Sequence, residues 1–190
     1  MGSTDRVRVG VTLAADYQQV ATTPSDIWQH LPRLVGLTHR LNAQHVIELG
    51  TRSGVSTTAW LYGLSLTGGR LTSIDLDPQP EIGEWPHWTF IQGDDLNPAI
   101  VSTLEPADIV FIDTSHLYEH TLAELHVYRW LARRAIVLHD TDLEQPIGAP
   151  PRPRFPVRQA IEEFCAAENL PWTNHPGCFG LGIINVRGRH

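Results

Sequence analysis

The sequence predicts an α/β fold with one doubly wound sheet whose strands are mostly parallel and whose faces are covered by helices. Short apolar runs that suit buried strands alternate along the chain with segments of helical periodicity. Several of these runs end on a carboxylate, as expected where parallel strands open onto a binding crevice. The length of 190 residues suits one domain and is enough to bury about 70% of the surface that the unfolded chain would expose.

The first segment, residues 1–24, is polar apart from one apolar run at 7–13, and it predicts a mobile N-terminal arm or lid. We expect the folded domain to comprise residues 25–190. Its first helix is expected to begin near Asp26, because an acceptor side chain there precedes apolar residues at helical spacing. Pro32 is expected to kink or split that helix.

Strands and helices then alternate to the end of the chain. The apolar runs predict strands at 46–49, 70–74, 89–92, 107–112, 135–138 and 180–186. The helical patterns predict helices at 56–66, 97–104, 118–132 and 157–168. The segment 145–154 is rich in Pro and Gly and follows a strand whose end should face a ligand. It predicts either a surface excursion or a flap over the site.

Composition and charge argue against several classes of protein. A nucleic-acid binder would need clustered Lys and Arg, whereas the formal net charge here is −7. Two cysteines, Cys165 and Cys178, predict free thiols. Because we find no signal peptide and no apolar run of about 18 residues, we expect a cytoplasmic protein without a membrane partner. The expected partner is a small-molecule substrate, with a homodimer as an open expectation.

A glycine-bracketed turn follows the first predicted strand. Gly50 and Gly54 let the backbone approach a ligand closely, and the amides of the next helix would face that ligand. Asp75 ends the neighbouring strand, where its carboxylate could accept hydrogen bonds from two ribose hydroxyls. A dinucleotide-binding turn has the pattern G-x-G-x-x-G, whereas this turn has E-x-G-x-x-x-G with Glu48 in front. A carboxylate beside the ligand favours a cationic cofactor.

Carboxylates also follow the fourth and fifth predicted strands. Asp113 follows the strand at 107–112, and Asp140 follows the strand at 135–138 with His139 beside it. Such adjacent strand ends bring like charges together, which protons, a cation or a positively charged substrate must compensate. Asp113 and Asp140, together with His139 or Asp142, form an oxygen-rich set that suits Mg or Mn better than Zn. The alternative is a hydrogen-bonded pair of aspartates without a metal.

Two histidines are candidates for catalysis. His116 and His120 match the pattern H-x-x-E-H of a group of zinc peptidases. However, His116 lies three residues after a strand end and should precede the helix, so the two rings would not share a helical face. We instead expect His116 to act as a general base with a pKa near neutrality, with helix capping as the alternative. His139, next to the acidic strand ends, is the second catalytic candidate.

These motifs together resemble the small bacterial class I S-adenosylmethionine-dependent methyltransferases of the methyltransferase-24 type, and the related cephalosporin hydroxylase and macrocin O-methyltransferase-like group. The resemblance spans residues 44–186 and is most specific in the stretch 111–119, F-I-D-T-S-H-L-Y-E. It implies a Rossmann-like sheet of seven strands with the last one antiparallel. In the macrocin-like group an acidic pair after strand five helps to bind a divalent ion, and here His139 and Asp140 take its place.

The resemblance implies S-adenosylmethionine as the cofactor. Glu48 would lie near its amino-acid end, and Asp94, after the third strand, would lie near the adenine amino group. A carboxylate that only caps the turn is the alternative for Asp94. The expected cofactor-binding residues are Glu48, Gly50, Ser53, Gly54, Asp75, Leu76, Gly93, Asp94 and Asp113.

The activity implied by the resemblance is O-methylation of a hydroxyl on a small molecule, such as a sugar or another specialised metabolite, with Mg or Mn as a candidate second cofactor. The protein would align the hydroxyl with the sulfonium methyl group and accept or attract the hydroxyl proton. Two alternatives stay open. One is an NAD-linked oxidoreductase, which the missing third glycine disfavours, and the other is a catalytically silent cofactor-binding module.

Overall fold

The computed structural model describes residues 3–83, 85–144 and 154–186. Within them, seven strands form one sheet in the order β3-β2-β1-β4-β5-β7-β6. Strands β1 to β5 are parallel, and β7 runs antiparallel between β5 and β6. This arrangement confirms the doubly wound sheet with a reversed last strand. The strands are β1 (His45–Leu49), β2 (Arg70–Asp75), β3 (Trp88–Gln92), β4 (Ala107–Ile112), β5 (Ala132–His139), β6 (Trp172–His175) and β7 (Leu181–Asn185).

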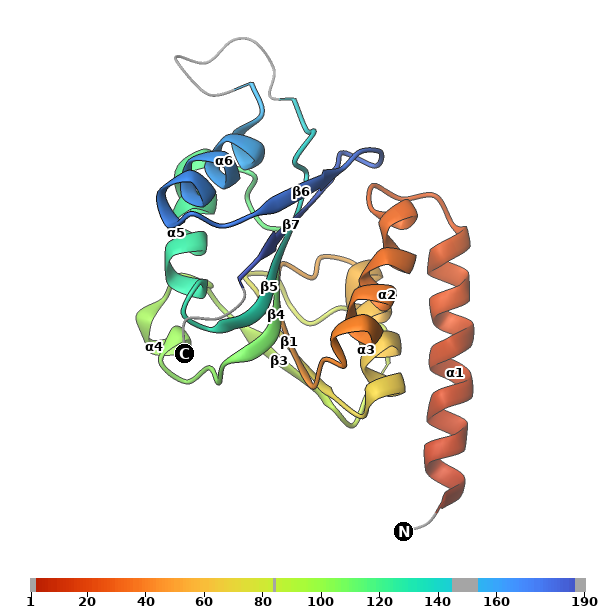
Figure 1. Ribbon diagram of the computed structural model, residues 1–190. Helices are drawn as coiled ribbons and strands as arrows, with labels where there is room; N and C mark the ends of the chain where they lie inside the picture. Colours follow the sequence, from red (N-terminus) through yellow and green to blue (C-terminus); the bar gives the residue numbers. More distant parts are fainter. Residues whose placement is uncertain (1–2, 84, 145–153, 187–190) are drawn as a thin grey trace.

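Helices cover both faces of the sheet (Figure 1). The layer drawn in red to yellow consists of α1 (Ser3–Thr22), α2 (Leu31–Leu41) and α3 (Val55–Thr67). The opposite layer consists of α4 (Pro98–Val101), α5 (Tyr118–Tyr128) and α6 (Pro156–Glu168). Among the described residues, no helix combines the length and the apolar character that crossing a membrane requires.

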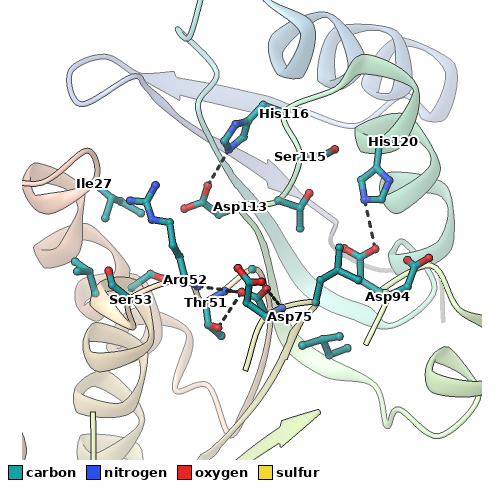
Figure 2. Close-up of a pocket in the computed structure, with 18 of the residues that line it drawn as sticks. Ile27, Thr51, Arg52, Ser53, Asp75, Asp94, Asp113, Ser115, His116 and His120 are labelled. Carbon is teal, nitrogen blue, oxygen red and sulfur yellow. Dashed lines mark hydrogen bonds and ion pairs between the residues drawn. The ribbon is translucent and has the colours of Figure 1, made fainter. Parts of the chain in front are cut away.

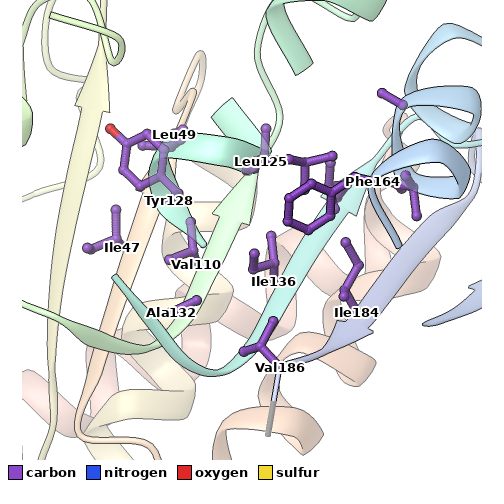
Figure 3. Packing of buried hydrophobic residues seen from close by; sticks show 14 of the residues in the cluster. Ile47, Leu49, Val110, Leu125, Tyr128, Ala132, Ile136, Phe164, Ile184 and Val186 are labelled. Atoms are coloured by element: carbon purple, nitrogen blue, oxygen red, sulfur yellow. The ribbon is translucent and has the colours of Figure 1, made fainter. Parts of the chain in front are cut away.

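The core has two apolar layers, one on each face of the sheet. Every residue of β1 is buried, because this central strand is covered on both sides. On one face, Tyr128 of α5 and Phe164 of α6 belong to the same buried cluster as Val110 of β4 (Figure 3). On the other face, Trp60 of α3 packs on Phe111 of β4 with ring centroids 5.5 Å apart. Burial of each large apolar side chain contributes about 1.5–3 kcal/mol to the free energy of unfolding. The sheet is therefore a stable support for the loops at its edge.

The order of the strands reverses between β1 and β4. From β1 the chain winds outward through β2 to β3, and then it returns to β4 on the other side of β1. In open α/β sheets this reversal leaves a crevice at the carboxyl ends of the strands, because the connections leave toward opposite faces. Gly50 follows β1 and Asp113 follows β4, so both residues lie at this crevice.

The N-terminal segment forms a helix that the sequence analysis did not predict. Helix α1 packs along α3, where Tyr17 stacks on Tyr62 with ring centroids 4.5 Å apart. Leu13 is buried among the apolar residues of this layer. The expected split at Pro32 is confirmed, since a short 3-10 turn at Trp28–His30 precedes α2 and Pro32 lies in the first turn of α2.

Other boundaries also differ from the prediction. Strand β6 was missed, because its sequence W-T-N-H is short and mostly polar and it pairs only with β7. Helix α5 ends at Tyr128 rather than at 132, and β5 begins at Ala132. Residues 145–153 of the expected flap lie outside the described residues. The free cysteines are, as predicted, Cys165 and Cys178.

Candidate functional site

A cavity opens at the carboxyl edge of the sheet, where the strand order reverses (Figure 2). Its volume of about 360 Å³ lies within the range of small-molecule sites. Most lining residues come from the loops after β1, β2, β3 and β4 and from the segment before α2, and the others belong to the end of β2 and to the first turns of α3 and α5. No described residue of α1 lines this cavity, so a lid role for the N-terminal segment stays a prediction. The predicted cofactor-binding residues that line the cavity are Gly50, Ser53, Asp75, Leu76, Gly93, Asp94 and Asp113.

Two glycines shape the turn after β1 for different reasons. Gly50 has a φ of +84°, and a Cβ there would lie 2.0 Å from the carbonyl oxygen of Asp113, so no side chain fits. Gly54, the residue before α3, has a φ of +81°, and a Cβ there would lie 2.5 Å from Cγ2 of Ile82. Gly54 is not among the residues that line the cavity. It therefore supports the turn through packing against Ile82.

Asp75 holds the turn and faces the cavity at the same time. Its Oδ2 accepts hydrogen bonds from the backbone N–H of Thr51 (2.6 Å), the Thr51 hydroxyl (2.9 Å) and the N–H of Arg52 (2.9 Å). Its Oδ1 accepts from the N–H of Asp77 (2.9 Å). Burial opposes ionisation, but these donors outweigh it and lower the pKa of Asp75. The side chain is thus charged, the state in which it accepts hydrogen bonds from ligand hydroxyls.

Glu48 lies behind the turn and does not line the cavity. Its fully buried carboxyl group accepts hydrogen bonds from the hydroxyls of Ser56 (2.8 Å), Thr57 (2.9 Å) and Ser73 (2.7 Å). Burial raises the pKa of Glu48 to about 7 in spite of these donors. Because the three hydroxyls belong to α3 and β2, Glu48 ties the start of α3 to the sheet. This position differs from the contact with the cofactor that the resemblance implied.

The carboxylates of Asp113, which follows β4, and of Asp140, which follows β5, lie close together, and two histidine rings contact both of them. His116 Nε2 lies 2.8 Å from Asp140 Oδ2 and 3.3 Å from Asp113 Oδ1, and Figure 2 shows this ring pointing at Asp113. His139 Nδ1 lies 3.1 Å from Asp140 Oδ2 and 3.6 Å from Asp113 Oδ1. Each carboxylate therefore faces both rings. We call these four side chains the acidic cluster.

The two rings carry the charge that compensates the carboxylates. Hydrogen bonds to Asp113 and then to Asp140 raise the pKa of His116 to about 9. Burial would lower the pKa of His139, but the same two carboxylates raise it to about 10. Burial would also raise the pKa of each aspartate, yet hydrogen bonds from the rings hold both pKa values below the usual range. At neutral pH His116 is thus an imidazolium, which corrects the expected pKa near neutrality.

His139 turns one ring nitrogen toward the carboxylates and holds its position with the other. Its Nε2 donates a hydrogen bond to the carbonyl oxygen of Cys178 at 2.8 Å. In the neutral ring this bond leaves the lone pair on Nδ1, which faces the two aspartates. One ligand atom from each of Asp113, His139 and Asp140 can be chosen so that all lie within 4.8 Å of one another. The residues present therefore fit a divalent ion.

His116 precedes α5, as its place after β4 predicted. Helix α5 begins at Tyr118, and His116 has a φ of +56°, so it shares no helical face with His120. His120 instead lies beside Asp95 and Glu124. The sequence analysis missed this second group, although the i,i+4 spacing of His120 and Glu124 was a signal for it.

An ion pair at the rim of the cavity was also missed. The guanidinium group of Arg52, in the turn after β1, pairs with the carboxylate of Asp26 from the segment before α2, and both residues line the cavity. The two residues are far apart in the sequence and neither belongs to a periodic pattern, so no sequence signal linked them.

A family of methyltransferase domains matches residues 47–141 of the chain. This range includes the glycine turn, Asp75 and the whole acidic cluster. The chain belongs to this methyltransferase family. The match confirms the resemblance to the methyltransferase-24 type that the motifs indicated. Among curated proteins, no match to the chain was found.

Solved structures share the fold of this methyltransferase at low sequence identity. The cofactor-bound structure of Rv0187 from MTB is 22% identical, with a TM-score of 0.68 over 95% of this chain and 90% of that one. The O-methyltransferase TomG from Streptomyces achromogenes, in complex with S-adenosylmethionine, is 18% identical, with a TM-score of 0.64 over 95% and 90%. The MycE methyltransferase, in complex with Mg and S-adenosylhomocysteine, is 17% identical, with a TM-score of 0.62 over 80% of this chain and 47% of that one.

Proposed function

We propose that this methyltransferase uses S-adenosylmethionine to methylate a hydroxyl group of a small molecule, such as a sugar or another specialised metabolite. The observation that carries the proposal is that a single cavity extends from the glycine turn after β1 to the acidic cluster. Gly50 and Asp75 line the cavity at the turn, and Asp113 and His116 line it beside the acidic cluster. A methyl donor along the turn would therefore lie next to groups that can hold a proton or a cation.

The cofactor is proposed to lie across the carboxyl ends of β1, β2 and β3. Asp75 would accept hydrogen bonds from its ribose hydroxyls, and Asp94 would accept one from the adenine amino group. Glu48 would act as a positioning residue, through the turn that it supports. The other predicted cofactor-binding residues that line the cavity are Gly50, Ser53, Leu76, Gly93 and Asp113.

The structural neighbours support this choice of cofactor. TomG is an O-methyltransferase in complex with S-adenosylmethionine, and MycE is in complex with Mg and S-adenosylhomocysteine. Since this chain shares their fold and has a cavity where the strand order reverses, the same nucleoside cofactor is the simplest ligand for it. No observation in the described residues favours a nicotinamide cofactor.

A divalent ion, Mg or Mn, is proposed at the acidic cluster. Asp113, His139 and Asp140 would hold it, because their ligand atoms converge and the Nδ1 lone pair of His139 faces the carboxylates. Bound there, such an ion would lower the pKa of the substrate hydroxyl and stabilise the negative charge that develops on its oxygen.

His116 is proposed to accept the proton of the substrate hydroxyl. A hydroxyl is a weak nucleophile at neutral pH, so its proton has to leave before or during methyl transfer. His116 lines the cavity, whereas His139 is buried behind it. His116 can act only after it loses the proton that two carboxylates stabilise. A substrate oxygen that displaced one of these ion pairs would lower the pKa of the ring and make it a base.

Binding measurements test the cofactor, and turnover tests the reaction. In calorimetry, S-adenosylhomocysteine should bind with micromolar affinity and NAD should not bind; the reverse result would point to an oxidoreductase. The protein should then release S-adenosylhomocysteine from S-adenosylmethionine when one of a panel of hydroxylated sugars and phenols is added, detected by mass spectrometry. Binding without turnover on any member of the panel would favour the silent module instead.

A further inference from the structure

A second group of potential metal ligands lies apart from the acidic cluster. It consists of Asp95, from the loop after β3, and of His120 and Glu124, which occupy successive turns of α5. His120 Nε2 lies 3.4 Å from Asp95 Oδ1 and 3.4 Å from Glu124 Oε1. Figure 2 shows the ring of His120 reaching from α5 toward the loop that carries Asp94. We call these three side chains the second cluster.

The two carboxylates of the second cluster are buried, while His120 is partly exposed, and the cluster is short of hydrogen-bond donors. Glu124 has no exposed surface, and its Oε2 has no hydrogen-bond partner among the described residues. Its Oε1 accepts one hydrogen bond, from the hydroxyl of Thr114 at 2.7 Å. A buried carboxylate oxygen without a partner is strongly unfavourable, because it loses its hydration and gains nothing in return. Glu124 thus has one oxygen, Oε1, that faces His120, and a second oxygen, Oε2, that has no partner among the described protein atoms.

Charge leads to the same conclusion. Two carboxylates, Asp95 and Glu124, face a single histidine in a buried environment. One imidazole ring can compensate the charge of only one of the two carboxylates. A divalent ion would satisfy both carboxylates at once.

The spacing of the ligand atoms indicates which ion fits. In a tetrahedral zinc site with bonds of about 2.0–2.1 Å, neighbouring ligand atoms lie about 3.3–3.4 Å apart. The two distances from His120 Nε2 are both 3.4 Å. Around octahedral Mg, with bonds of about 2.1 Å, adjacent ligand atoms lie about 3.0 Å apart, and the ion prefers oxygen. The equal distances of 3.4 Å around His120 are therefore closer to the spacing of a zinc site.

We propose that Asp95, His120 and Glu124 form a zinc site of their own, with three protein ligands and a fourth position open toward the cavity. Asp95 and His120 both line that cavity, so the open position is accessible to water or to a bound ligand. The ion would tie the loop after β3 to α5, which holds Asp94 in place at the wall. This site does not depend on the proposed methyl transfer, since metal content alone reports on it.

Zinc content tests the proposal directly. The parent, His120→Ala and His126→Ala would be stripped with a chelator, dialysed against micromolar Zn²⁺, and measured by mass spectrometry of the metal. His126 is an exposed histidine of the same helix, which makes it a matched control. We expect His120→Ala to hold one zinc ion per chain fewer than the parent and than His126→Ala. Zn²⁺ should also raise the melting temperature of the parent more than that of His120→Ala.

Two further variants keep the test decisive. Asp95→Asn changes a loop residue with little change in shape, so it should fold even if His120→Ala does not, and it should lose the same zinc ion. His139→Ala removes a ligand of the acidic cluster and should keep that ion. A parent without zinc, or His120→Ala and Asp95→Asn with the same zinc content as the parent, would overturn the proposal and leave a carboxyl pair that shares a proton.

Discussion

The carbonyl oxygen of Asp113 occupies the space that a side chain on Gly50 would need. A Cβ at Gly50 would lie 2.0 Å from that oxygen. The N–H of Asp113 also donates to the carbonyl oxygen of Leu49 at 2.9 Å, so the two chain segments cannot separate without breaking a hydrogen bond of the sheet. This contact sets how closely the glycine turn approaches the acidic cluster.

Gly50→Ala is therefore expected to destabilise the protein more than Gly68→Ala. Both glycines have a positive φ, +84° and +76°, but a Cβ at Gly68 would meet nothing within 4 Å. Gly68→Ala should cost about 1–2 kcal/mol for the left-handed backbone, and Gly50→Ala should cost about 1–3 kcal/mol more for the overlap with Asp113. Urea unfolding measures both. Equal losses would show that the overlap relaxes without cost.

Asp75→Ala should weaken the binding of S-adenosylhomocysteine by about 10- to 150-fold, because charge-assisted hydrogen bonds to the ribose contribute roughly 1.5–3 kcal/mol. Calorimetry gives the affinities. Glu81→Ala is the control, since Glu81 is an exposed carboxylate outside the cavity lining, and its affinity should match the parent's. A folded Asp75→Ala variant with parental affinity would remove Asp75 from the cofactor site.

Asp140→Asn is expected to abolish metal-dependent turnover and to leave S-adenosylhomocysteine binding largely intact. The reason is that Asp140 belongs to the acidic cluster but does not line the cavity. Turnover would be followed against Mg²⁺ concentration in both proteins, and cofactor affinity by calorimetry. If the parent keeps its full rate in EDTA, the acidic cluster has a role other than metal binding.

His116→Ala should lower kcat by about 100-fold or more, the usual contribution of a positioned general base. Cofactor affinity should stay close to the parent's, because the proposed role concerns only the substrate proton. His126→Ala, a change on an exposed face of α5, should keep the parental kcat. Near-parental turnover by His116→Ala would move the base to another residue of the acidic cluster.

The pKa of His116 can be measured independently of turnover. In the metal-free protein, NMR titration of the ring should give a pKa of about 9, because Asp113 and Asp140 both stabilise its charged form. Addition of Mg²⁺ should lower that pKa, since the carboxylates would then share their charge with the ion. A ring that titrates near its usual pKa in the metal-free protein would mean that the two ion pairs do not persist in solution.

Glu48 should make the protein less stable as the pH rises. Its pKa is raised from 4.5 to about 7 in the folded state. Below pH 4.5 the carboxyl is protonated in both states, so its titration changes nothing. Between about pH 4.5 and 7 the unfolded chain releases this proton while the folded protein keeps it, so the free energy of unfolding falls. Above pH 7 the loss is complete, at about 3 kcal/mol.

Glu48→Gln tests this dependence because it removes the titration and keeps the shape. The stability of the variant relative to the parent should increase between pH 5 and pH 8, by up to about 3 kcal/mol. Urea unfolding of both proteins at the two pH values measures the difference. A constant difference would mean that the three hydroxyl donors keep Glu48 ionised throughout.

Much of the site could be predicted from the sequence because parallel strands place their carboxyl ends at one edge of the sheet. Asp75 and Asp113 each follow an apolar run, so their positions at the crevice followed from strand order alone. The glycine turn was predictable from local conformation, because Gly50 and Gly54 both have a positive φ, which favours glycine. The helix α1 was not predictable, because its segment has no marked apolar stripe and is stabilised by packing on α3.

The sequence by itself thus determined the α/β sheet, the crevice and most residues around it, because these depend on local patterns and on the direction of strands. Only the tertiary structure decided which side chains touch. Glu48 turned out to face three hydroxyls, His116 two carboxylates, and His120 a pair of acids that no motif had connected. Burial and charge act through space over a few ångströms, and such distances between segments are set by packing.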